Sequence, residues 1–269
     1  MKDTTIALAS QNSICGLYKE NLSKCIKLST EASEKGASLI LFPEMNLTGY
    51  ASGKKLIDIA RPISTELIDT LQDISSKESI TIVAGLAHLD ADNKIYASQF
   101  AVMPDKKLFI YKKIHTAPPE KKFLSSGNKI KTCHDKKNNL SFAIQLCYDA
   151  HFPQLATLMA LKGADLIMIP HASPRGTSEE KYQSWMRHLT ARAFDNSVYI
   201  AACNQAGKNC NGLSFPAVSM IIGPDGKVVS KKTDNKEGLL ISKLSGSALD
   251  SIRSHRMKYF LPNLRDDLY

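Results

Sequence analysis

An apolar run in the middle of the chain ends abruptly on a cysteine. Residues 140–146 read Leu-Ser-Phe-Ala-Ile-Gln-Leu, and Cys147 is followed at once by Tyr148 and Asp149. A cysteine in this place can be a small apolar residue of the core. It can also be a nucleophile held at the end of a buried strand, and that interpretation requires partner residues elsewhere in the chain.

A glutamate occupies a similar place earlier in the chain. Glu44 follows the apolar run Leu39–Phe42 and Pro43, and a proline stops further pairing of a strand. A carboxylate close to the core has a raised pKa because burial disfavours its charged form, and a raised pKa suits a general base. The alternative is a turn residue or a helix cap.

Two lysines, Lys112 and Lys113, end a third apolar run, Leu108–Tyr111. Neighbouring side chains of a strand point to opposite faces, so at most one of the two lysines faces the interior. A lysine held there would be a fixed positive charge that could stabilise an oxyanion. Glu120 follows in a Pro-Pro-Glu-Lys-Lys segment. For each of these residues the alternative is an ordinary place on the surface.

The segment after Cys147 predicts a helix from about Pro153 to Leu161, with apolar residues along one side. A cysteine between a strand and that helix would face the positive end of the helix dipole, which favours the thiolate. Because the thiolate is the nucleophilic form, a nearby base would complete the activation of Cys147.

Short apolar strands and amphipathic helices must hold these side chains in place. Helical periodicity runs through 18–32, 67–74 and 182–193. The order begins β-α-β-α-β, is rich in strands from about 80 to 146, and then alternates again, which predicts an α/β fold with a mixed sheet or two sheets between helix layers. The expected strands are 6–9, 39–42, 80–86, 96–103, 108–111, 140–146, 166–169, 198–202 and 217–222.

No linker rich in Gly, Pro or Ser divides the chain, so we expect residues 1–269 to form a single domain. Residues 124–139 are the longest candidate loop. The tail after Gly246 is polar, and we expect it to be irregular. This tail, about 247–269, could lie at the interface with a partner subunit.

Composition excludes several classes of protein. The chain has 35 Lys+Arg against 26 Asp+Glu, but its lysine doublets are scattered rather than gathered on one element with aromatic residues, so we expect no nucleic-acid partner. No apolar run approaches the roughly 20 residues that span a bilayer, and the first apolar run is too short for a signal peptide. These features favour a cytoplasmic protein without a membrane partner. The six cysteines show no C-x-x-C spacing, so we expect reduced thiols and no zinc site.

Glutamate, lysine and cysteine at three successive strand ends, in that chain order, make this sequence resemble the nitrilase superfamily of carbon–nitrogen hydrolases. The resemblance extends from about residue 4 to about residue 225. Its most specific carriers are Phe42-Pro43-Glu44 with Leu47-Thr48-Gly49-Tyr50, Tyr111-Lys112-Lys113-Ile114-His115, and Leu146-Cys147-Tyr148-Asp149 with Phe152-Pro153. Further carriers are Gly163-Ala164-Asp165-Leu166, Arg192-Ala193-Phe194-Asp195-Asn196, Asn204-Gln205 and Gly223-Pro224-Asp225-Gly226.

The resemblance implies a four-layer α-β-β-α sandwich with two mixed sheets, and a site that needs neither metal nor organic cofactor. It implies a catalytic triad of Glu44, Lys113 and Cys147, with Glu120 as a second glutamate that positions the substrate. In this sequence Gln154 replaces the glutamate usual after Phe-Pro, and Ser125-Ser126-Gly127 lacks the usual proline. Tyr148-Asp149 is closer to amidases and carbamoyl hydrolases than to true nitrilases.

The implied reaction is hydrolysis of a small amide or N-carbamoyl compound through a thioester on Cys147. The backbone N–H of Tyr148 would help Lys113 to hold the oxyanion, and His171 could line the pocket. The resemblance places substrate specificity in loops, here about 115–135, 171–180 and 204–214, and implies a homodimer or larger homo-oligomer. Nitrile hydrolysis on the same triad is an alternative.

Three other interpretations stay open on the residues alone. A papain-like Cys-His hydrolase would use His115, His151 or His171, although their spacing fits no such pattern that we can argue. A binding protein could keep the fold without catalysis. A thiol-redox role would use an exposed cysteine of low pKa, but no resolving cysteine lies near Cys147 in the sequence.

Overall fold

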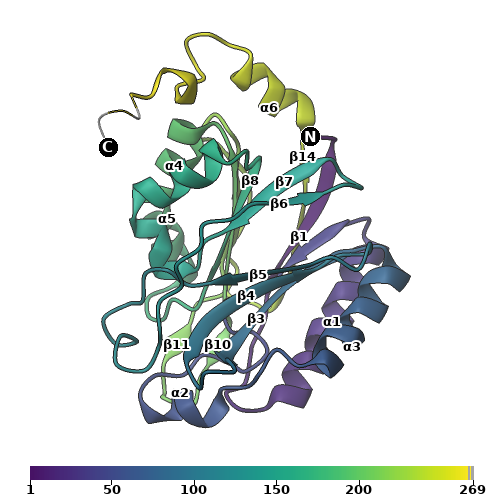
Figure 1. Cartoon of the computed structure of the whole chain (residues 1–269), viewed down its shortest axis with the longest axis vertical. Helices are drawn as coiled ribbons and strands as arrows, with labels where there is room; N and C mark the ends of the chain where they lie inside the picture. The colour runs from purple at the N-terminus through teal and green to yellow at the C-terminus, as the bar shows by residue number, and fades with distance from the viewer. Residues whose placement is uncertain (266, 268–269) are drawn as a thin grey trace.

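Two six-stranded sheets pack face to face, and a layer of helices covers the outer face of each sheet (Figure 1). The computed structural model describes residues 1–265 and 267. This arrangement confirms the expected four-layer α-β-β-α sandwich with two mixed sheets. In both sheets the central strands are parallel and the outer strands are antiparallel.

The first sheet carries two of the candidate catalytic residues, one after β2 and one after β5. Strands β1, β2 and β3 run parallel, with Leu39–Leu41 paired to both neighbours, because helical crossovers join them. The strand order is β14 (Gly238–Leu244), β1 (Thr4–Ser10), β2 (Leu39–Leu41), β3 (Thr81–Leu89), β4 (Ile95–Val102) and β5 (Leu108–Lys112).

The second sheet carries the candidate nucleophile after β7. Strands β7, β8 and β9 are parallel, and every residue of β8 and β9 is buried, as expected for strands covered on both faces. The strand order is β13 (Val228–Lys232), β12 (Ser219–Ile222), β9 (Tyr199–Asn204), β8 (Leu166–His171), β7 (Leu140–Ile144) and β6 (Cys133–Asp135). A separate hairpin pairs β10 (Gly207–Lys208) with β11 (Ser214–Phe215).

Helices α1 (Tyr18–Glu34) and α3 (Thr65–Glu78) cover the first sheet, and α4 (Pro153–Leu161) and α5 (Ser178–Asn196) cover the second (Figure 1). The predicted helix 153–161 agrees with α4. The short helices are α2 (Lys54–Ile59), the 3-10 helix η1 (Cys147–His151), α6 (Gly246–Arg253) and the 3-10 helix η2 (Leu261–Asn263).

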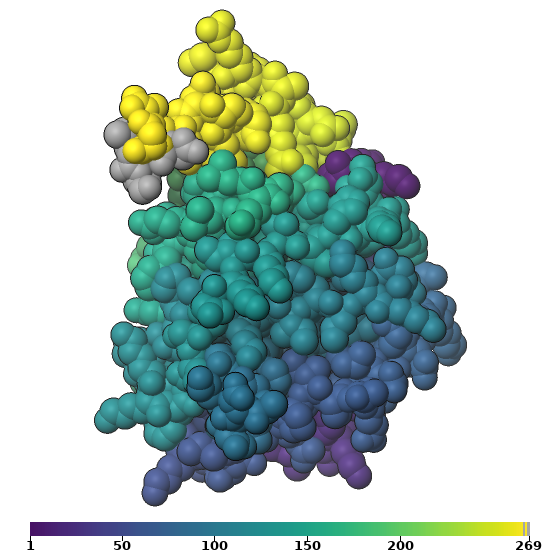
Figure 2. Space-filling model, in the orientation of Figure 1, coloured from purple at the N-terminus to yellow at the C-terminus, as the bar shows by residue number. Residues whose placement is uncertain are grey.

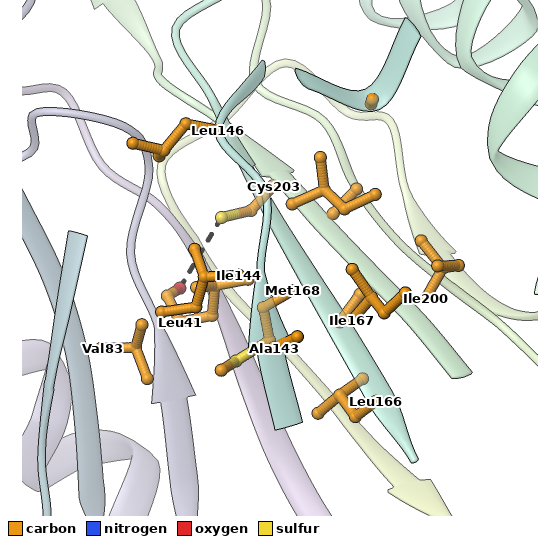
Figure 3. Close-up of a cluster of buried hydrophobic side chains, with 14 of the residues drawn as sticks. Leu41, Val83, Ala143, Ile144, Leu146, Leu166, Ile167, Met168, Ile200 and Cys203 are labelled. Atoms are coloured by element: carbon orange, nitrogen blue, oxygen red, sulfur yellow. Dashed lines mark hydrogen bonds between the residues drawn. The ribbon is translucent and has the colours of Figure 1, made fainter. Parts of the chain in front are cut away.

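Aliphatic side chains fill the space between the two sheets. Leu41 and Val83 of the first sheet face Ile144 and Met168 of the second (Figure 3). The thiol of Cys203 in β9 reaches across to the carbonyl of Leu41 in β2 at 3.7 Å. Burial of apolar surface, at about 25 cal/mol per Å², is the main contribution that holds the two sheets together. The strand ends that carry the candidate site are therefore fixed by a packed core.

The tail after Gly246 is not irregular throughout, which corrects the sequence prediction. Residues Gly246–Arg253 form α6, because the Ser245 side chain caps the Ala248 N–H and Leu249 is buried against the body. Residues 254–265, drawn in yellow, continue from α6 across one end of the molecule (Figures 1 and 2). Residues 266, 268 and 269 of the expected interface segment lie outside the described residues.

Two predicted strands extend beyond the observed ones, one at its C-terminal end and one at its N-terminal end. The expected strand 140–146 ends at Ile144, and the expected strand 217–222 begins at Ser219. The candidate loop 124–139 contains β6, which pairs with β7. In each case the boundary is set by which backbone groups form hydrogen bonds with a neighbouring strand. The local sequence pattern does not contain that information.

Candidate active site

Residues from both sheets meet where β2, β5 and β7 end. Glu44 follows β2, Lys113 follows β5, and Cys147 follows β7. Glu120 comes from the loop after β5. The structure therefore brings together all four side chains that the sequence singled out, although Glu44 and Lys113 are 69 residues apart in the chain.

A buried lysine links two buried carboxylates. The Lys113 Nζ donates to Glu44 Oε1 at 2.8 Å and to the two oxygens of Glu120 at 2.9 and 3.2 Å. All three side chains are at most 3% exposed. A buried charge is costly unless it is paired, and here one ammonium serves two carboxylates. The three groups together carry a net negative charge when all are ionised.

Burial shifts the pKa of both partners in this group. Burial raises the pKa of Glu44; the charge of Lys113 opposes that shift, while the charge of Glu120 adds to it. For Lys113, burial lowers the pKa, but the charges of Glu44 and Glu120 outweigh it and raise the pKa well above the usual range. Lys113 is therefore a permanent cation, and Glu44 is a carboxylate that takes up a proton more readily than an exposed one.

Further hydrogen bonds fix the position of Glu120. Its Oε1 accepts from the Tyr50 hydroxyl at 3.0 Å, and its Oε2 accepts from the Ala117 N–H at 2.8 Å. The loop that carries it closes where the Gly127 N–H donates to the Lys113 carbonyl at 2.7 Å. A side chain at Gly127 would collide with the Lys112 carbonyl, which explains the glycine at the end of this loop.

Cys147 is less buried than its three partners and begins the 3-10 helix η1 with a left-handed backbone, φ 46°. Non-glycine residues rarely adopt this conformation, which is a strained one. The Ala172 N–H donates to Glu44 Oε2 at 3.2 Å and also lowers the pKa of Cys147. One backbone amide from the end of β8 thus lies beside both the carboxylate and the sulfur.

The expected stabilisation of a thiolate by a helix dipole is wrong. The 3-10 helix η1 separates Cys147 from the start of α4. Burial, and then the charge of Glu44, raise the pKa of Cys147, while the charge of Lys113 lowers it in part. The raised pKa favours the thiol as the resting form, so Cys147 would need a base to become a nucleophile.

Asp149 joins several segments of the candidate site, a contact role that the sequence reasoning did not assign to it. It is fully buried, and its carboxylate accepts from the Tyr111 hydroxyl at 2.7 Å and from the Leu146 N–H at 3.0 Å. It also accepts from the backbone N–H and the ring Nδ1 of His115 at 2.7 and 2.9 Å. The sequence feature that could have indicated this role is an acidic residue two positions after Cys147, in a segment otherwise expected to be buried.

His171 is buried at the end of β8, next to Ala172, and its ring stacks on Trp185 with centroids 4.2 Å apart. Burial lowers its pKa well below the usual range, so the ring is neutral. The Tyr148 ring packs edge-on against His151 and Phe152. The roles expected for His171 and for the Tyr148 N–H stay predictions.

Lys112 points away from the site. Its Nζ pairs with Asp90 at 3.1 Å and lies 3.7 Å from the centre of the Tyr96 ring. Alternation along β5 thus places Lys113 inside and Lys112 outside, as the strand argument allowed. The two lysines are adjacent in sequence but occupy different environments.

The Cys-His alternative finds no support in the geometry. His115 bonds Asp149, His151 stacks on His188, and His171 stacks on Trp185. Within residues 1–265 and 267, none of these imidazoles forms a hydrogen bond with Cys147. The same described residues contain no cluster of three or more metal-binding side chains.

Two of the six cysteines are not reduced thiols, which corrects the sequence prediction. Cys15 and Cys210 form a disulfide with their Cα atoms 5.6 Å apart. Loops bring the two residues together although they are 195 positions apart, and a spacing pattern cannot reveal such a contact. Cys25, Cys133, Cys147 and Cys203 are free.

Comparisons with known proteins agree with the fold. The family model of the carbon-nitrogen hydrolases matches residues 5–254. A probable nitrilase from Schizosaccharomyces pombe is 30% identical over 278 aligned positions, which cover 100% of this chain and 98% of that protein. An omega-amidase from Mus musculus is 27% identical over 269 positions, which cover 96% of this chain and 94% of that protein.

Among solved structures, a variant of the amidase from Nesterenkonia sp. AN1 superposes with a TM-score of 0.82 at 23% identity, covering 98% of this chain and 95% of that one. This likeness shows the fold. The family match spans most of the chain, so the protein belongs to the carbon–nitrogen hydrolase family. It is a hydrolase of the amidase-like kind, and its substrate is left open by these relatives.

No helix in the described part of the chain is both long enough and apolar enough to cross a membrane.

Proposed function

We propose that this protein hydrolyses the carbon–nitrogen bond of a small amide or N-carbamoyl compound through a thioester on Cys147, with Glu44, Lys113 and Cys147 as its triad. The observation that carries the proposal is that buried Glu44 and Glu120 both accept hydrogen bonds from buried Lys113, beside a partly accessible cysteine. Buried ion pairs are a poor source of stability, so a functional reason for keeping three charged groups here is needed.

In the first half of the reaction, Glu44 takes the proton from Cys147 as the sulfur attacks the carbonyl carbon of the substrate. The raised pKa of Glu44 suits this role, because a base accepts a proton best when its pKa lies near the working pH. The tetrahedral adduct carries an oxyanion, which Lys113 and the Tyr148 N–H stabilise. One such donor is worth roughly 2.7–4 kcal/mol of activation free energy.

The carbon–nitrogen bond then breaks, and Glu44 returns its proton to the leaving ammonia or amine. In the second half, Glu44 removes a proton from water, and the resulting hydroxide attacks the thioester carbon. Collapse of this second adduct releases the acid product, and the sulfur leaves as a thiolate that regains its proton from Glu44. Glu120 orients Lys113 throughout, since it accepts two hydrogen bonds from that ammonium.

One structural neighbour supports the choice of nucleophile. In a variant of the Nesterenkonia amidase, the acetamide moiety of fluoroacetamide is covalently added at the active-site cysteine. In this chain Cys147 is the free cysteine that is not buried. Cys147 is therefore our assignment for the equivalent nucleophile.

Nitrile hydrolysis is a second candidate, favoured by the similarity over the whole chain to the probable nitrilase of S. pombe. Attack of the thiolate on a nitrile carbon would use the same base and the same cation. The residues around Cys147 alone do not separate the two reactions, so the substrate panel below includes both classes.

The test is ammonia release from short amides, N-carbamoyl amines and acids, and nitriles, with wild type, Cys147→Ala and Cys147→Ser side by side. Release by wild type and its loss in Cys147→Ala support the proposal, and the best substrate distinguishes amidase from nitrilase. Cys133→Ala is the matched control, because Cys133 is a buried free cysteine outside the site. Turnover that survives in Cys147→Ala would refute the assigned nucleophile. No turnover, with Cys147 unmodified by mass spectrometry, would favour a binding protein.

We also propose a homodimer. Its support is that apolar side chains are exposed on α4, α5 and the C-terminal segment, where the Phe194 and Phe260 rings lie with centroids 5.5 Å apart. The exposed residues are Leu158, Leu161, Phe194, Met257 and Phe260. Light scattering of the wild type and of a Phe194→Glu variant tests it. The cytoplasmic location stays a prediction, and the disulfide between Cys15 and Cys210 does not favour it, because thiols are kept reduced in the cytosol.

A further inference from the structure

An accessible disulfide joins two loops that come from different sheets. Cys15 lies in the loop after β1 of the first sheet, and Cys210 lies at the tip of the β10–β11 hairpin, which follows β9 of the second sheet. The hairpin lies beside α2 (Figure 1), where the Lys55 ammonium donates to the Cys210 carbonyl. Cys210 is exposed and Cys15 is half-buried, so dissolved reagents can reach the bond between them.

The loop that carries Cys15 packs tightly against the segment 48–52. The Gly16 N–H donates to the Thr48 carbonyl at 2.8 Å. Gly49 has a φ of 72°, and a Cβ atom there would lie 2.6 Å from the Cys15 Cα, closer than real Cβ atoms approach. The backbone of Cys15 is therefore in direct contact with the backbone just before Tyr50.

The hairpin that carries the second cysteine contacts the same segment. The Asn209 side-chain amide donates to the Tyr50 carbonyl at 2.9 Å. Asn209 is buried, and its Oδ1 accepts from the Leu213 N–H at 2.9 Å, which fixes the turn at the hairpin tip. The Tyr50 ring packs edge-on against Phe215 of β11, with centroids 6.0 Å apart. The hairpin thus holds both the backbone and the ring of Tyr50.

Tyr50 connects these loops to the candidate active site. Its hydroxyl donates to Glu120 Oε1 at 3.0 Å, and the same carboxylate accepts from the Lys113 Nζ at 2.9 and 3.2 Å. Tyr50 is 8% exposed, and a side chain packed this closely moves only when its neighbours move. One side chain therefore links the two loops joined by the disulfide to the carboxylate that holds Lys113.

The hairpin has little stability of its own. Strands β10 and β11 are two residues long, and they pair only through Gly207 with Phe215 and Lys208 with Ser214. An isolated two-stranded hairpin is marginal in water even when it is longer. The bond to Cys15 is consequently a main constraint on the hairpin tip, and breaking it gives the tip more conformations to visit.

We propose that the Cys15–Cys210 disulfide is a redox switch: the oxidised form holds Tyr50 and Glu120 in place and is the more active form, and reduction by a dithiol lowers the rate of hydrolysis. This inference rests on the proposed function, because it assumes that Glu120 and Lys113 act in the reaction. The two cysteines are positioning residues and touch no reacting atom. Where thiols are kept reduced, the disulfides that do form are usually transient and redox-sensing, which fits an accessible bond.

Reduction follows the ordinary course of thiol–disulfide exchange. A thiolate of the dithiol attacks the sulfur of Cys210, the more exposed cysteine, and a mixed disulfide forms while Cys15 leaves as a thiolate and takes up a proton. The second thiol of the reductant then attacks the reductant's own sulfur in the mixed disulfide, which releases Cys210 as a thiol. Two electrons and two protons pass from the dithiol to the protein, and the dithiol becomes a disulfide.

A purely stabilising role is the competing explanation, because any cross-link restricts the unfolded chain. The two explanations differ in what they predict for the folded enzyme. A stabilising role changes the resistance to unfolding and leaves kcat/KM of the folded protein unaltered. A positioning role changes kcat/KM, and it does so through Tyr50, so the effect must shrink when the Tyr50 hydroxyl is absent.

The experiment compares oxidised wild type with wild type reduced by dithiothreitol and freed of reductant without oxygen, on the best substrate of the panel above. Alkylation and peptide mass spectrometry establish the state of each cysteine, so that both samples have Cys147 as a thiol. The variants are the double variant Cys15→Ser, Cys210→Ser, and Tyr50→Phe with and without those two changes. Cys133→Ala is the control, because Cys133 is a buried free cysteine outside the disulfide.

We expect reduction to lower kcat/KM of wild type roughly 10-fold, since small displacements of catalytic groups have large effects. The double serine variant should match reduced wild type and should not respond to dithiothreitol, whereas Cys133→Ala should respond as wild type does. In Tyr50→Phe the loss on removing the disulfide should fall below about 2-fold, because the two changes interrupt one path. Equal kcat/KM in the oxidised and reduced forms, or an undiminished loss in Tyr50→Phe, would overturn the inference and leave the proposed function intact.

Absence of turnover on every substrate would instead overturn the proposed function, and hydrogen exchange then tests the switch separately. Faster exchange of residues 48–52 and 207–215 in reduced than in oxidised protein, with unchanged exchange in β8, supports a device that positions Tyr50. Equal exchange in the two forms overturns it. Recovery of Cys15 and Cys210 as thiols after incubation with oxidised glutathione overturns it as well.

Discussion

Asp149 accepts hydrogen bonds from both the backbone N–H and the ring Nδ1 of His115, at 2.7 and 2.9 Å. His115 lies two residues after Lys113, and Asp149 lies two residues after Cys147. The pair therefore joins the lysine-bearing end of the first sheet to the cysteine-bearing end of the second. Its importance is positional: it fixes the distance between two groups that the fold supplies from separate sheets.

Replacing Asp149 should be severe. Asp149→Ala leaves two backbone N–H groups and the Tyr111 hydroxyl without their acceptor, and buried unpaired donors are costly. We expect a loss of about 3–5 kcal/mol in the free energy of unfolding and at least a 100-fold loss of turnover, since small displacements of catalytic groups have large effects. Denaturant titration and steady-state kinetics on the folded fraction measure the two effects.

His115→Ala is the matched control, because it removes only the ring contact and keeps the backbone N–H. Its cost should be about 1 kcal/mol. Equal stability loss in the two variants would mean that the ring of His115, and not the carboxylate as a whole, holds the segments together.

The two adjacent lysines should behave differently. Lys113→Ala leaves Glu44 and Glu120 buried without a cation, which should destabilise the protein by about 3–5 kcal/mol and collapse turnover. Lys112→Ala removes a partly exposed pair with Asp90, worth about 0–1 kcal/mol, and should leave the reaction running. Ammonia release and thermal unfolding of both variants decide the matter. An inactive Lys112→Ala with an active Lys113→Ala would reverse the assigned faces of β5.

The elements predicted best from the sequence are those whose own residues show a clear apolar pattern. The central strands β2, β8 and β9 are apolar throughout, and α4 begins at a proline with apolar residues along one side. Strands β13 and β14 were missed, because they mix lysine and serine with aliphatic residues and are only partly buried. Their pairing with β12 and β1 supplies the stability that their own pattern does not indicate.

The candidate site could be predicted in its members but not in its electrostatics. Strand alternation limited the interior lysine to one of two, and the resemblance selected Lys113. The thiolate expected for Cys147 depended on a helix dipole, whereas burial and the charge of Glu44 dominate and arise from the packing of two sheets.

Acid should destabilise the fold partly through His188. Burial, and then the positive charges of His151 and Arg192, lower its pKa to about 4, against about 6.5 in an unfolded chain. The unfolded state therefore binds more protons between these values. The stability from His188 is complete above pH 6.5 and is lost as the pH falls toward 4.

Replacing His188 with glutamine should flatten the fall in unfolding free energy over this window by about 1–2 kcal/mol, after discounting for partial exposure. Denaturant titrations at several pH values between 4 and 7 measure the slope. The exposed His255 provides the control substitution, His255→Gln. A slope in His188→Gln identical to wild type would show that the ring is not held neutral.

Removing the charge of Glu120 should move the acid limb of the pH–rate profile. If Glu44 is the base, kcat/KM falls as the pH drops through the pKa of Glu44, because the protonated acid cannot accept the thiol proton. Burial raises that pKa, Lys113 lowers it, and the negative charge of Glu120 raises it again. Glu120→Gln abolishes the last of these contributions, so the acid limb should shift to lower pH, along with a loss of rate from the weakened hold on Lys113.

The variant Tyr50→Phe distinguishes the effect of the Glu120 charge from the effect of the hydrogen bonds to Glu120. It removes the 3.0 Å contact to Glu120 but keeps the carboxylate, so its acid limb should stay near that of wild type. Profiles of kcat/KM against pH for the three enzymes, with one amide substrate, make the comparison. If the acid limb of Glu120→Gln moves to higher pH, the titrating group behind that limb is not Glu44. Because the sign of the shift depends only on the charge of Glu120, it tests the assigned base independently of how much activity either variant retains.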